Sequence, residues 1–239
     1  MTNPPVKYWN IEADWTVPAV QDVPAYLSYA AAAEWVGLDN AGNDLVQSGT
    51  DSEAINLNFF GQDFTFSVYS VWLESLPDAP YYLSNLPVSP GDEISVDIFI
   101  ADENGNPTFS NGDLTASDDT VWFMIYNLST NNSYWGTLPK PAAFSGSTAD
   151  FIVEAPLVNG STASLADFGI AGMHDCWFSD SWAGFGSLDY DGSDPSIGTS
   201  NDITMVNFGD GNTLASSYIH PNFDTPGGGN ILWVWQNYN

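Results

Sequence analysis

Gln47 lies in a stretch whose residue types could bind and polarise a water molecule or a carbonyl group. Residues 34–51 have the pattern of two short strands joined by a polar turn, and strand alternation then places Gln47 opposite Gly37. Trp35 and Asp39 flank that pair diagonally on the same face. An amide, an indole and a carboxylate would surround the space that the glycine leaves. The pattern predicts a polar site on this hairpin, although ordinary hairpin packing also fits it.

Two glutamates, Glu74 and Glu154, stand at the ends of two further expected strands, residues 64–74 and 150–154. Glu74 shares a face with several aromatic side chains, and Glu154 shares a face with Ile152. Burial against apolar neighbours disfavours a charged carboxylate and raises its pKa into the range useful for acid–base catalysis. Strand-end glutamates that point into water are the alternative, and the sequence leaves both open.

A nucleophile activated by histidine is poorly supported. The chain has only two histidines, His174 and His220, and no Gly-x-Ser-x-Gly motif. His174, Asp175 and Cys176 are contiguous, so their side chains would alternate between faces if they form a strand. We therefore expect these residues to be structural.

Three aspartates, Asp189, Asp191 and Asp194, have a spacing similar to that of a calcium-binding loop. The glutamate expected nine residues after Asp191 is replaced by Ser200. We expect a solvated acidic loop.

The chain is strongly acidic. Thirty carboxylates against two lysines and no arginine give a formal net charge of -28 at pH 7. Nothing in the chain could neutralise phosphates, so nucleic-acid binding is excluded and binding to anionic membranes is disfavoured. No apolar run approaches the roughly 20 residues of a transmembrane helix. Aromatic residues make up 15% of the chain, which argues against disorder.

The acidic composition fits a protein that works either at high salt or at low pH. Only 13% of the residues are charged, so the surface is not saturated with acid. We favour low pH, where carboxylates protonate near their ordinary pKa of about 4 and the repulsion vanishes. We further expect crowding to raise the pKa of native carboxylates, so that stability falls as the pH rises through the raised values.

The setting expected from these features is extracellular and acidic, and we expect a monomer. The first residues, MTNPPVKYWN, lack the basic and apolar pattern of a signal peptide. Either the protein is cytosolic or a leader or propeptide is absent from this sequence, and we expect the second. The single cysteine, Cys176, excludes an intramolecular disulfide.

Short runs rich in β-branched and aromatic residues alternate with turn clusters, and no amphipathic helix is evident. Besides the hairpin, the expected strands span residues 64–74, 93–101, 121–127, 133–138, 150–154, 202–208 and 231–236. The alanine run 30–33 leads into the hairpin, and residues 184–201 are expected to form a long loop over one end. The pattern predicts an all-β, single-domain antiparallel β-sandwich of two large sheets over residues 1–239.

Five segments stand in an order and spacing that match a known family. They are EADWTVPAV at 12–20, WVGLD at 35–39, QSGTD at 47–51, the stretch 72–92 with its SPGD turn, and DFIVE at 150–154. Through them the chain resembles the glutamic peptidases, or eqolisins, over roughly residues 11–180. It departs from the fungal members in lacking disulfides, in the less acidic residues 155–157, and in the insertion at 184–201.

The resemblance implies a concanavalin A-like, lectin-like sandwich and an acid endopeptidase that acts on polypeptides and requires neither a metal ion nor a cofactor. It implies that Gln47 stabilises the oxyanion and that Glu154 acts on water as general base and then general acid. The residues it places around them, as substrate-binding or orienting groups, are Trp35, Asp39, Asp51 and Glu74. Gln47 and Glu154 must then face each other across one cleft.

Two other functions stay open at this point. A carbohydrate-binding module or glycosidase could use the ten tryptophans for stacking, and Glu74 with Glu154 could supply its two carboxylates. The second open function is that of an inert structural or surface protein in a high-salt habitat.

Overall fold

Two antiparallel sheets form the protein. The computed structural model describes residues 7–20, 29–39, 44–107, 109–110, 113–114, 119–158, 160–180, 184–187, 204–206, 213–220 and 229–235. Within these residues every pairing between named strands is antiparallel, and there is no helix. None of the described segments is therefore a helix that could cross a membrane.

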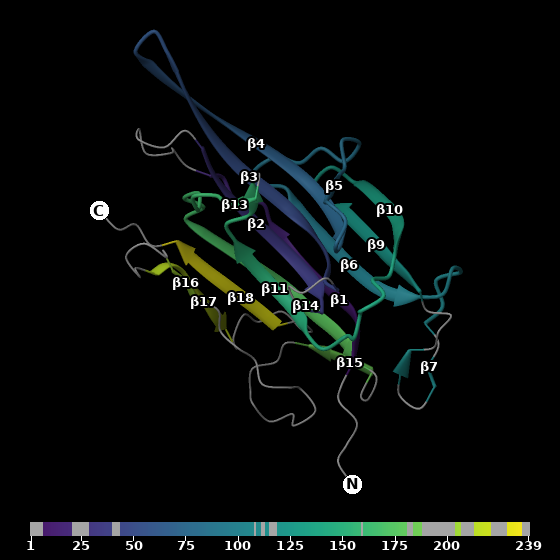
Figure 1. Ribbon diagram of the computed structural model, residues 1–239. Helices are drawn as coiled ribbons and strands as arrows, with labels where there is room; N and C mark the ends of the chain where they lie inside the picture. The colour runs from purple at the N-terminus through teal and green to yellow at the C-terminus, as the bar shows by residue number, and fades with distance from the viewer. Residues whose placement is uncertain are drawn as a thin grey trace.

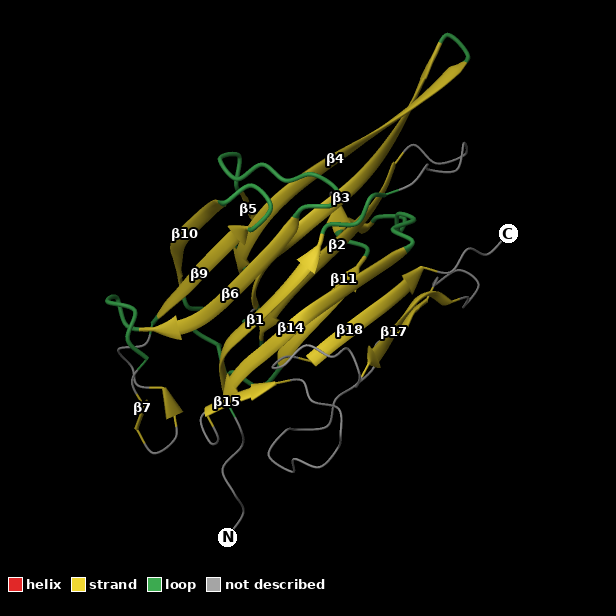
Figure 2. Ribbon diagram, turned by 180° about the vertical axis from the view of Figure 1, so that it is seen from behind, coloured by secondary structure: helices red, strands yellow, loops and turns green. Residues whose placement is uncertain are grey.

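The larger sheet has nine strands among the described residues (Figure 2). In spatial order they are β10 (Asn132–Pro139), β9 (Thr120–Asn127), β6 (Glu93–Ala101), β1 (Tyr8–Thr16), β14 (Ile170–Asp180), β18 (Gly229–Trp235), β17 (Thr213–His220) and β16 (Thr204–Val206), with β15 (Gly184–Ser187) paired to β14. In β6 the residues alternate between buried and half-buried, as expected for a strand with one face on a core.

The smaller sheet has five strands and lies over the first as a second layer (Figure 1). In spatial order they are β11 (Ala149–Glu154), β2 (Tyr29–Leu38), β3 (Val46–Phe59), β4 (Gln62–Ser75) and β5 (Tyr81–Tyr82). Two separate ribbons complete the described strands: β12 (Leu157–Val158) with β13 (Ser161–Thr162), and β7 (Phe109–Ser110) with β8 (Asp113–Leu114). The β3–β4 hairpin projects well beyond the rest of the molecule (Figure 1).

One apolar cluster fills the space between the two sheets. It includes Ile94, Ile98 and Phe123 of the large sheet and Val36 and Leu38 of the small sheet, all fully buried. The predicted antiparallel sandwich is therefore confirmed.

Most strands lie where the sequence predicts them. β6 has the predicted bounds, and β4, β9, β10, β11 and β18 lie within two residues of theirs. β16 falls inside the predicted strand 202–208, whose other residues lie outside the described part of the chain. The hairpin register is also confirmed, because Gly37 pairs with Gln47.

Three expectations need correction. The strands of the hairpin are much longer than residues 34–39 and 45–51, and the alanine run 30–33 lies inside β2 rather than before it. Alanine fits there because β2 is buried on both faces and leaves little room for larger side chains. The predicted loop 184–201 begins with strand β15, and Asp189, Asp191 and Asp194 lie outside the described residues.

β14 was not predicted, because its alternation is broken in the middle. Asp175 has a φ of 49°, and the register with β18 shifts between Met173 and Cys176. A bulge of this kind changes which side chains share a face. β17 was missed because its sequence, TLASSYIH, is mostly small and polar.

Candidate active site

The face of the small sheet that points away from the core carries the candidate site. Along β2, Val36 and Leu38 belong to the main core, whereas Ala33 and Trp35 belong to a separate apolar cluster with Trp72. Side chains alternate across a strand, so the odd positions of β2 and β3 and the even positions of β4 and β11 share this outward face.

Three rows of side chains cross this outward face from strand to strand. The first row is Asp150, Gly37, Gln47 and Glu74; the second is Ile152, Trp35, Gly49, Trp72 and Tyr82; the third is Glu154, Ala33, Asp51 and Ser70. The middle row is mainly apolar, and each outer row carries carboxylates. The sheet thus brings together Gln47, Glu74, Glu154, Trp35 and Asp51, which the sequence places up to 119 residues apart (154 − 35).

Gln47 is held by Glu74. The Gln47 Nε2 donates to Glu74 Oε2 at 2.5 Å, and Gln47 is only 8% exposed. The buried Gln47 Oε1 has no protein partner. Burial raises the pKa of Glu74, while the Gln47 amide opposes this rise by bonding to the ionised form.

Glu154 is the second carboxyl group with a perturbed pKa. Burial raises the pKa of Glu154, and the nearby negative charge of Glu74 raises it further. The Trp35 indole opposes the rise, although its Nε1–H is buried without a hydrogen bond of standard geometry. The expectation that a glutamate on this strand face is desolvated is confirmed for both Glu154 and Glu74.

Asp51 is fixed from two sides. The Trp72 Nε1 donates to its Oδ1 at 2.9 Å, and the Tyr82 hydroxyl donates to its Oδ2 at 3.0 Å. Burial raises the pKa of Asp51 to about 6 despite these two bonds, and the charge of Glu154 contributes to the rise. Asp51 is therefore electrostatically part of the same site as Glu154.

Asp39 does not share the face of Gln47, and that expectation is wrong. Its φ is 75°, which ends the alternation of β2. Its carboxylate accepts hydrogen bonds from the backbone N–H groups of Ser145, Gly146 and Ser147 and from both serine hydroxyls. Burial raises the pKa of Asp39, but these hydrogen bonds outweigh it and the net pKa is lowered. Asp39 holds the segment that leads into β11.

Gln47 and Glu154 are not in direct contact. Glu154 pairs with Ala33, which pairs with Asp51, four positions from Gln47 along β3. In a flat sheet this offset is about 13 Å along the strands and about 10 Å across them. The gap between two extended side chains then suits an intervening group rather than a hydrogen bond between them.

Asp150 and Tyr82 are two ionisable residues of this face that did not enter the predicted site. Asp150 faces outward with Glu154, and burial raises its pKa to about 6. The alternation of residues 150–154 could have revealed Asp150, because it places Asp150 on the same face as Glu154. Tyr82 belongs to the two-residue strand β5, which no sequence pattern marks.

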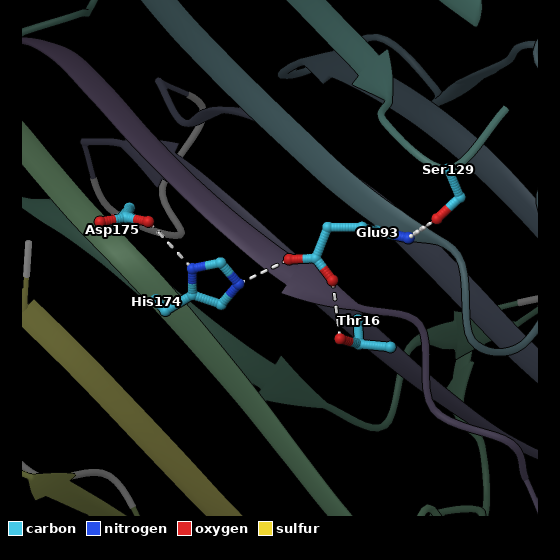
Figure 3. A network of polar contacts seen from close by, with 5 residues as sticks. All are labelled: Thr16, Glu93, Ser129, His174 and Asp175. Atoms are coloured by element: carbon cyan, nitrogen blue, oxygen red, sulfur yellow. Dashed lines mark hydrogen bonds and ion pairs between the residues drawn. The ribbon is translucent and has the colours of Figure 1, made fainter. Parts of the chain in front are cut away.

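A second polar network lies on the large sheet and joins residues of β1, β6 and β14 (Figure 3). His174 Nε2 lies 2.5 Å from Glu93 Oε1, and His174 Nδ1 lies 3.1 Å from Asp175 Oδ2. The Thr16 hydroxyl donates to the other oxygen of Glu93 at 2.7 Å. The expectation that His174 and Asp175 point to opposite faces is wrong, because the positive φ of Asp175 turns its side chain back.

His174, Asp175 and Asp14 could together ligate a metal ion, since one ligand atom of each lies within 4.8 Å of the others. When protonated, His174 instead forms ion pairs with Glu93 and Asp175. Burial lowers the pKa of His174, but the bonds to Asp175 and Glu93 outweigh it and the net pKa is raised. The network ties β1, β6 and β14 together, in keeping with the structural role expected for His174.

A family model describes most of this chain. The model of the peptidase A4 family matches residues 1–219. No curated protein sequence matches the chain significantly.

Solved structures share the fold. Scytalido-glutamic peptidase with a transition state analog inhibitor is 17% identical, with a TM-score of 0.67 over 96% of this chain and 93% of that chain. SCP-B, a member of the eqolisin family in a complex with the tripeptide Ala-Ile-His, is 17% identical, with a TM-score of 0.64 over 99% and 100%. Aspergilloglutamic peptidase from Aspergillus niger is 22% identical, with a TM-score of 0.59 over 87% and 99%.

Proposed function

This chain belongs to the peptidase A4 family, and we propose that it is an acid-acting endopeptidase in which Glu154 and Gln47 carry out the chemistry. As a family member it is a peptidase, and its substrates are polypeptides. One observation carries the assignment of residues: Gln47, Glu74 and Glu154 lie on one outward sheet face, where the buried Gln47 amide bonds to Glu74 and burial raises the pKa of both carboxyl groups.

Peptide hydrolysis on this face begins with a water molecule. The ionised Glu154 takes a proton from the water, whose oxygen attacks the carbonyl carbon of the scissile bond. The carbonyl oxygen becomes an oxyanion, to which the Gln47 amide donates a hydrogen bond. Glu154 then gives the proton to the peptide nitrogen, and the C–N bond breaks to leave an acid and an amine.

The polar groups of Gln47 support this role. One of its two N–H groups is held by Glu74, which leaves the second for an oxyanion. Its buried Oε1 has no protein partner, whereas the buried Trp35 Nε1–H interacts with Glu154 without a hydrogen bond of standard geometry. Buried polar groups are normally paired, so the unpaired Gln47 Oε1 supports binding of water or of a peptide N–H group at this site.

The pH dependence follows from the two glutamates. Glu154 must be ionised to accept a proton, and its pKa is raised. The acid limb of the activity profile should therefore lie above the ordinary pKa of a glutamate, with activity in mild acid. We also propose an acidic extracellular setting, on the ground of this profile and the net charge of -28.

The family match favours a peptidase over the carbohydrate-binding alternative. The test is digestion of an acid-unfolded protein between about pH 2 and 6. We expect Glu154→Gln to lower kcat/KM by about 10²–10⁴-fold, and Gln47→Ala by about 10²–10³-fold. Glu103→Gln removes an exposed carboxylate elsewhere and serves as the matched control. A wild type that cleaves nothing, or two active-site variants that cleave normally, would overturn the proposal.

A further inference from the structure

We propose that the projecting end of the β3–β4 hairpin, residues 55–68, is an extension of the substrate-binding surface that holds apolar segments of an unfolded polypeptide. We call it the apolar arm. The inference rests on the proposed function, because it takes the outward face that carries Gln47 and Glu74 as the place where the polypeptide is cut.

The apolar arm exposes large hydrophobic side chains that a soluble surface normally hides. Phe59 is 57% exposed, Phe64 52% and Phe66 45%, and Leu57 and Val68 are exposed as well. Both views show the arm standing clear of the two sheets (Figures 1 and 2). Contiguous apolar patches on a surface mark sites of interaction, whereas single exposed residues do not.

These side chains continue the face of the candidate active site. Along the β3–β4 ladder the outward pairs run from Gln47 with Glu74 through Gly49 with Trp72, Asp51 with Ser70, Glu53 with Val68 and Ile55 with Phe66 to Leu57 with Phe64. Phe59 and Phe64 meet edge to face, with ring centroids 6.4 Å apart. This β3–β4 strip therefore carries Gln47 and Glu74 at one end and an aromatic surface at the other.

The apolar face of the arm is not an extension of the core. In the body of the hairpin the inward side chains, such as Val71 and Leu73, are apolar and belong to the core. In the arm, the positions with the same inward parity are polar: Asn56 and Asn58 on β3, and Thr65 and Ser67 on β4. The apolar side thus changes from inward to outward along the same two strands. Core packing gives no reason for that change.

An unfolded polypeptide is the occupant that fits this strip. The strip is two strands wide and continuous with the place of cleavage, so a chain bound there in extended form would cover both. Asp63 is the only ionisable residue between positions 54 and 68, which suits an apolar partner. The net charge of -28 opposes both an anionic membrane surface and a second copy of this chain at neutral pH.

The arm begins at a defined distance from the scissile bond. Val68 lies six positions from Glu74 along β4, which is about 20 Å in a strand. A peptide of about six residues that fills the site therefore does not reach the arm, whereas a chain that extends about six or more residues past the scissile bond does.

The test compares three peptides with one scissile sequence. The first has about six residues, the second carries an added tail of about 14 residues rich in Leu and Phe, and the third carries a Ser/Gly tail of equal length. Tails are placed on either side of the scissile bond in separate peptides. The variant is Phe59→Ser with Phe64→Ser and Phe66→Ser; the matched control is Thr65→Ser with Ser67→Asn on the polar face of the same arm. Thermal melts check that both fold.

We expect the wild type and the control to cleave the apolar-tailed peptide with a kcat/KM about tenfold or more above that of the Ser/Gly-tailed peptide. The triple variant should lose this preference and still cleave the short peptide at the wild-type rate. An unchanged preference in the triple variant, or no preference in the wild type, overturns the inference while leaving the peptidase function in place.

Failure of the proposed function would look different, because the wild type would then cleave none of the three peptides. Anisotropy of the labelled apolar-tailed peptide with Glu154→Gln protein still tests the arm in that case, and weaker binding with the triple substitution added supports it. Phosphatidylcholine vesicles and sedimentation velocity test the other occupants. Vesicle binding or self-association that depends on the three phenylalanines, with cleavage preference unchanged, overturns the inference.

Discussion

At the scale of single residues, the site combines a group that cannot titrate with groups that do. The Gln47 amide keeps its donors at every pH, whereas burial raises the pKa of both Glu74 and Glu154. The hydrogen bond from Gln47 to Glu74 couples the two kinds of group. The orientation of the amide therefore depends on a carboxylate that itself responds to pH.

Glu74→Gln tests that coupling. The negative charge of Glu74 raises the pKa of Glu154, so an uncharged amide at position 74 should lower it. The base then stays ionised at lower pH, and the acid limb of the kcat/KM profile should move to lower pH, by up to about one pH unit for a half-buried neighbour. The profile is measured with a short peptide between about pH 2 and 7. An unmoved acid limb would show that Glu74 does not influence the base.

At the scale of elements, β2 and β3 approach each other closely at Trp35 and Gly49, in the middle row of the site. A Cβ on Gly49 would lie 2.1 Å from the carbonyl oxygen of Glu34 and 2.8 Å from the Cα of Trp35. Only a glycine lets the two strands keep this spacing. Asp39 acts at the same scale, because its carboxylate fixes residues 145–147 just before β11 and hence the strand that carries Glu154.

Gly49→Ala should therefore destabilise the fold. Backbone atoms surround the new methyl group and cannot give way as a side chain would, so we expect a loss of about 1–3 kcal/mol or more in the free energy of unfolding. Gly172→Ala is the matched strand glycine, whose nearest obstacle is a leucine methyl at 3.3 Å. Urea unfolding measures both. Equal losses for the two variants would contradict the role given to Gly49.

At the scale of the whole molecule, burial rather than crowding is the main cause of the raised pKa values. Burial is the largest cause for Glu34, whose pKa is about 8, for Asp97, about 7, and for Asp51 and Asp150, about 6. Charge repulsion is a smaller contribution. The predicted direction is confirmed for these groups, but its cause is desolvation in the sheets.

Stability should consequently fall as the pH rises. A carboxyl group with a raised native pKa binds more protons when folded, so its stabilising effect is present below its unfolded pKa and is lost as the pH rises through the native value. For the four groups above, that window runs from about pH 4 to about pH 8. Asp39, with a lowered pKa, acts oppositely and loses its contribution in stronger acid. We expect thermal melts at constant low salt to give a maximum in mild acid.

The variant Glu34→Gln isolates the contribution of one buried carboxyl group to the pH dependence of stability. Glu34 is 1% exposed in the core, where Thr50 donates to its Oε2 at 3.0 Å and its Oε1 is unpaired. An amide of the same shape does not ionise, so the variant should gain about 2 kcal/mol or more over the wild type between about pH 6 and 8. Glu103→Gln should leave the curve unchanged. A Glu34→Gln curve parallel to that of the wild type would contradict the burial argument.

The sequence alone determined what depends on local pattern. Alternation with a fixed period of two revealed the sandwich, the desolvated faces of Glu74 and Glu154, and the strands β4, β6, β9 and β11. A short polar turn set the register that places Gly37 opposite Gln47, because hairpin register depends on the turn and its flanking residues.

Tertiary structure decided what depends on segments far apart in the chain. Asp39 turns away from Gln47 because residues 145–147, more than 100 positions later, supply its hydrogen bonds. His174 meets Glu93 only because β14 and β6 both flank β1. The contact of Gln47 with Glu74 depends on the long β3–β4 pairing. The apolar arm exists because β3 and β4 extend beyond the other strands of both sheets. Such contacts are set by the packing of whole strands, which a local pattern of residues does not contain.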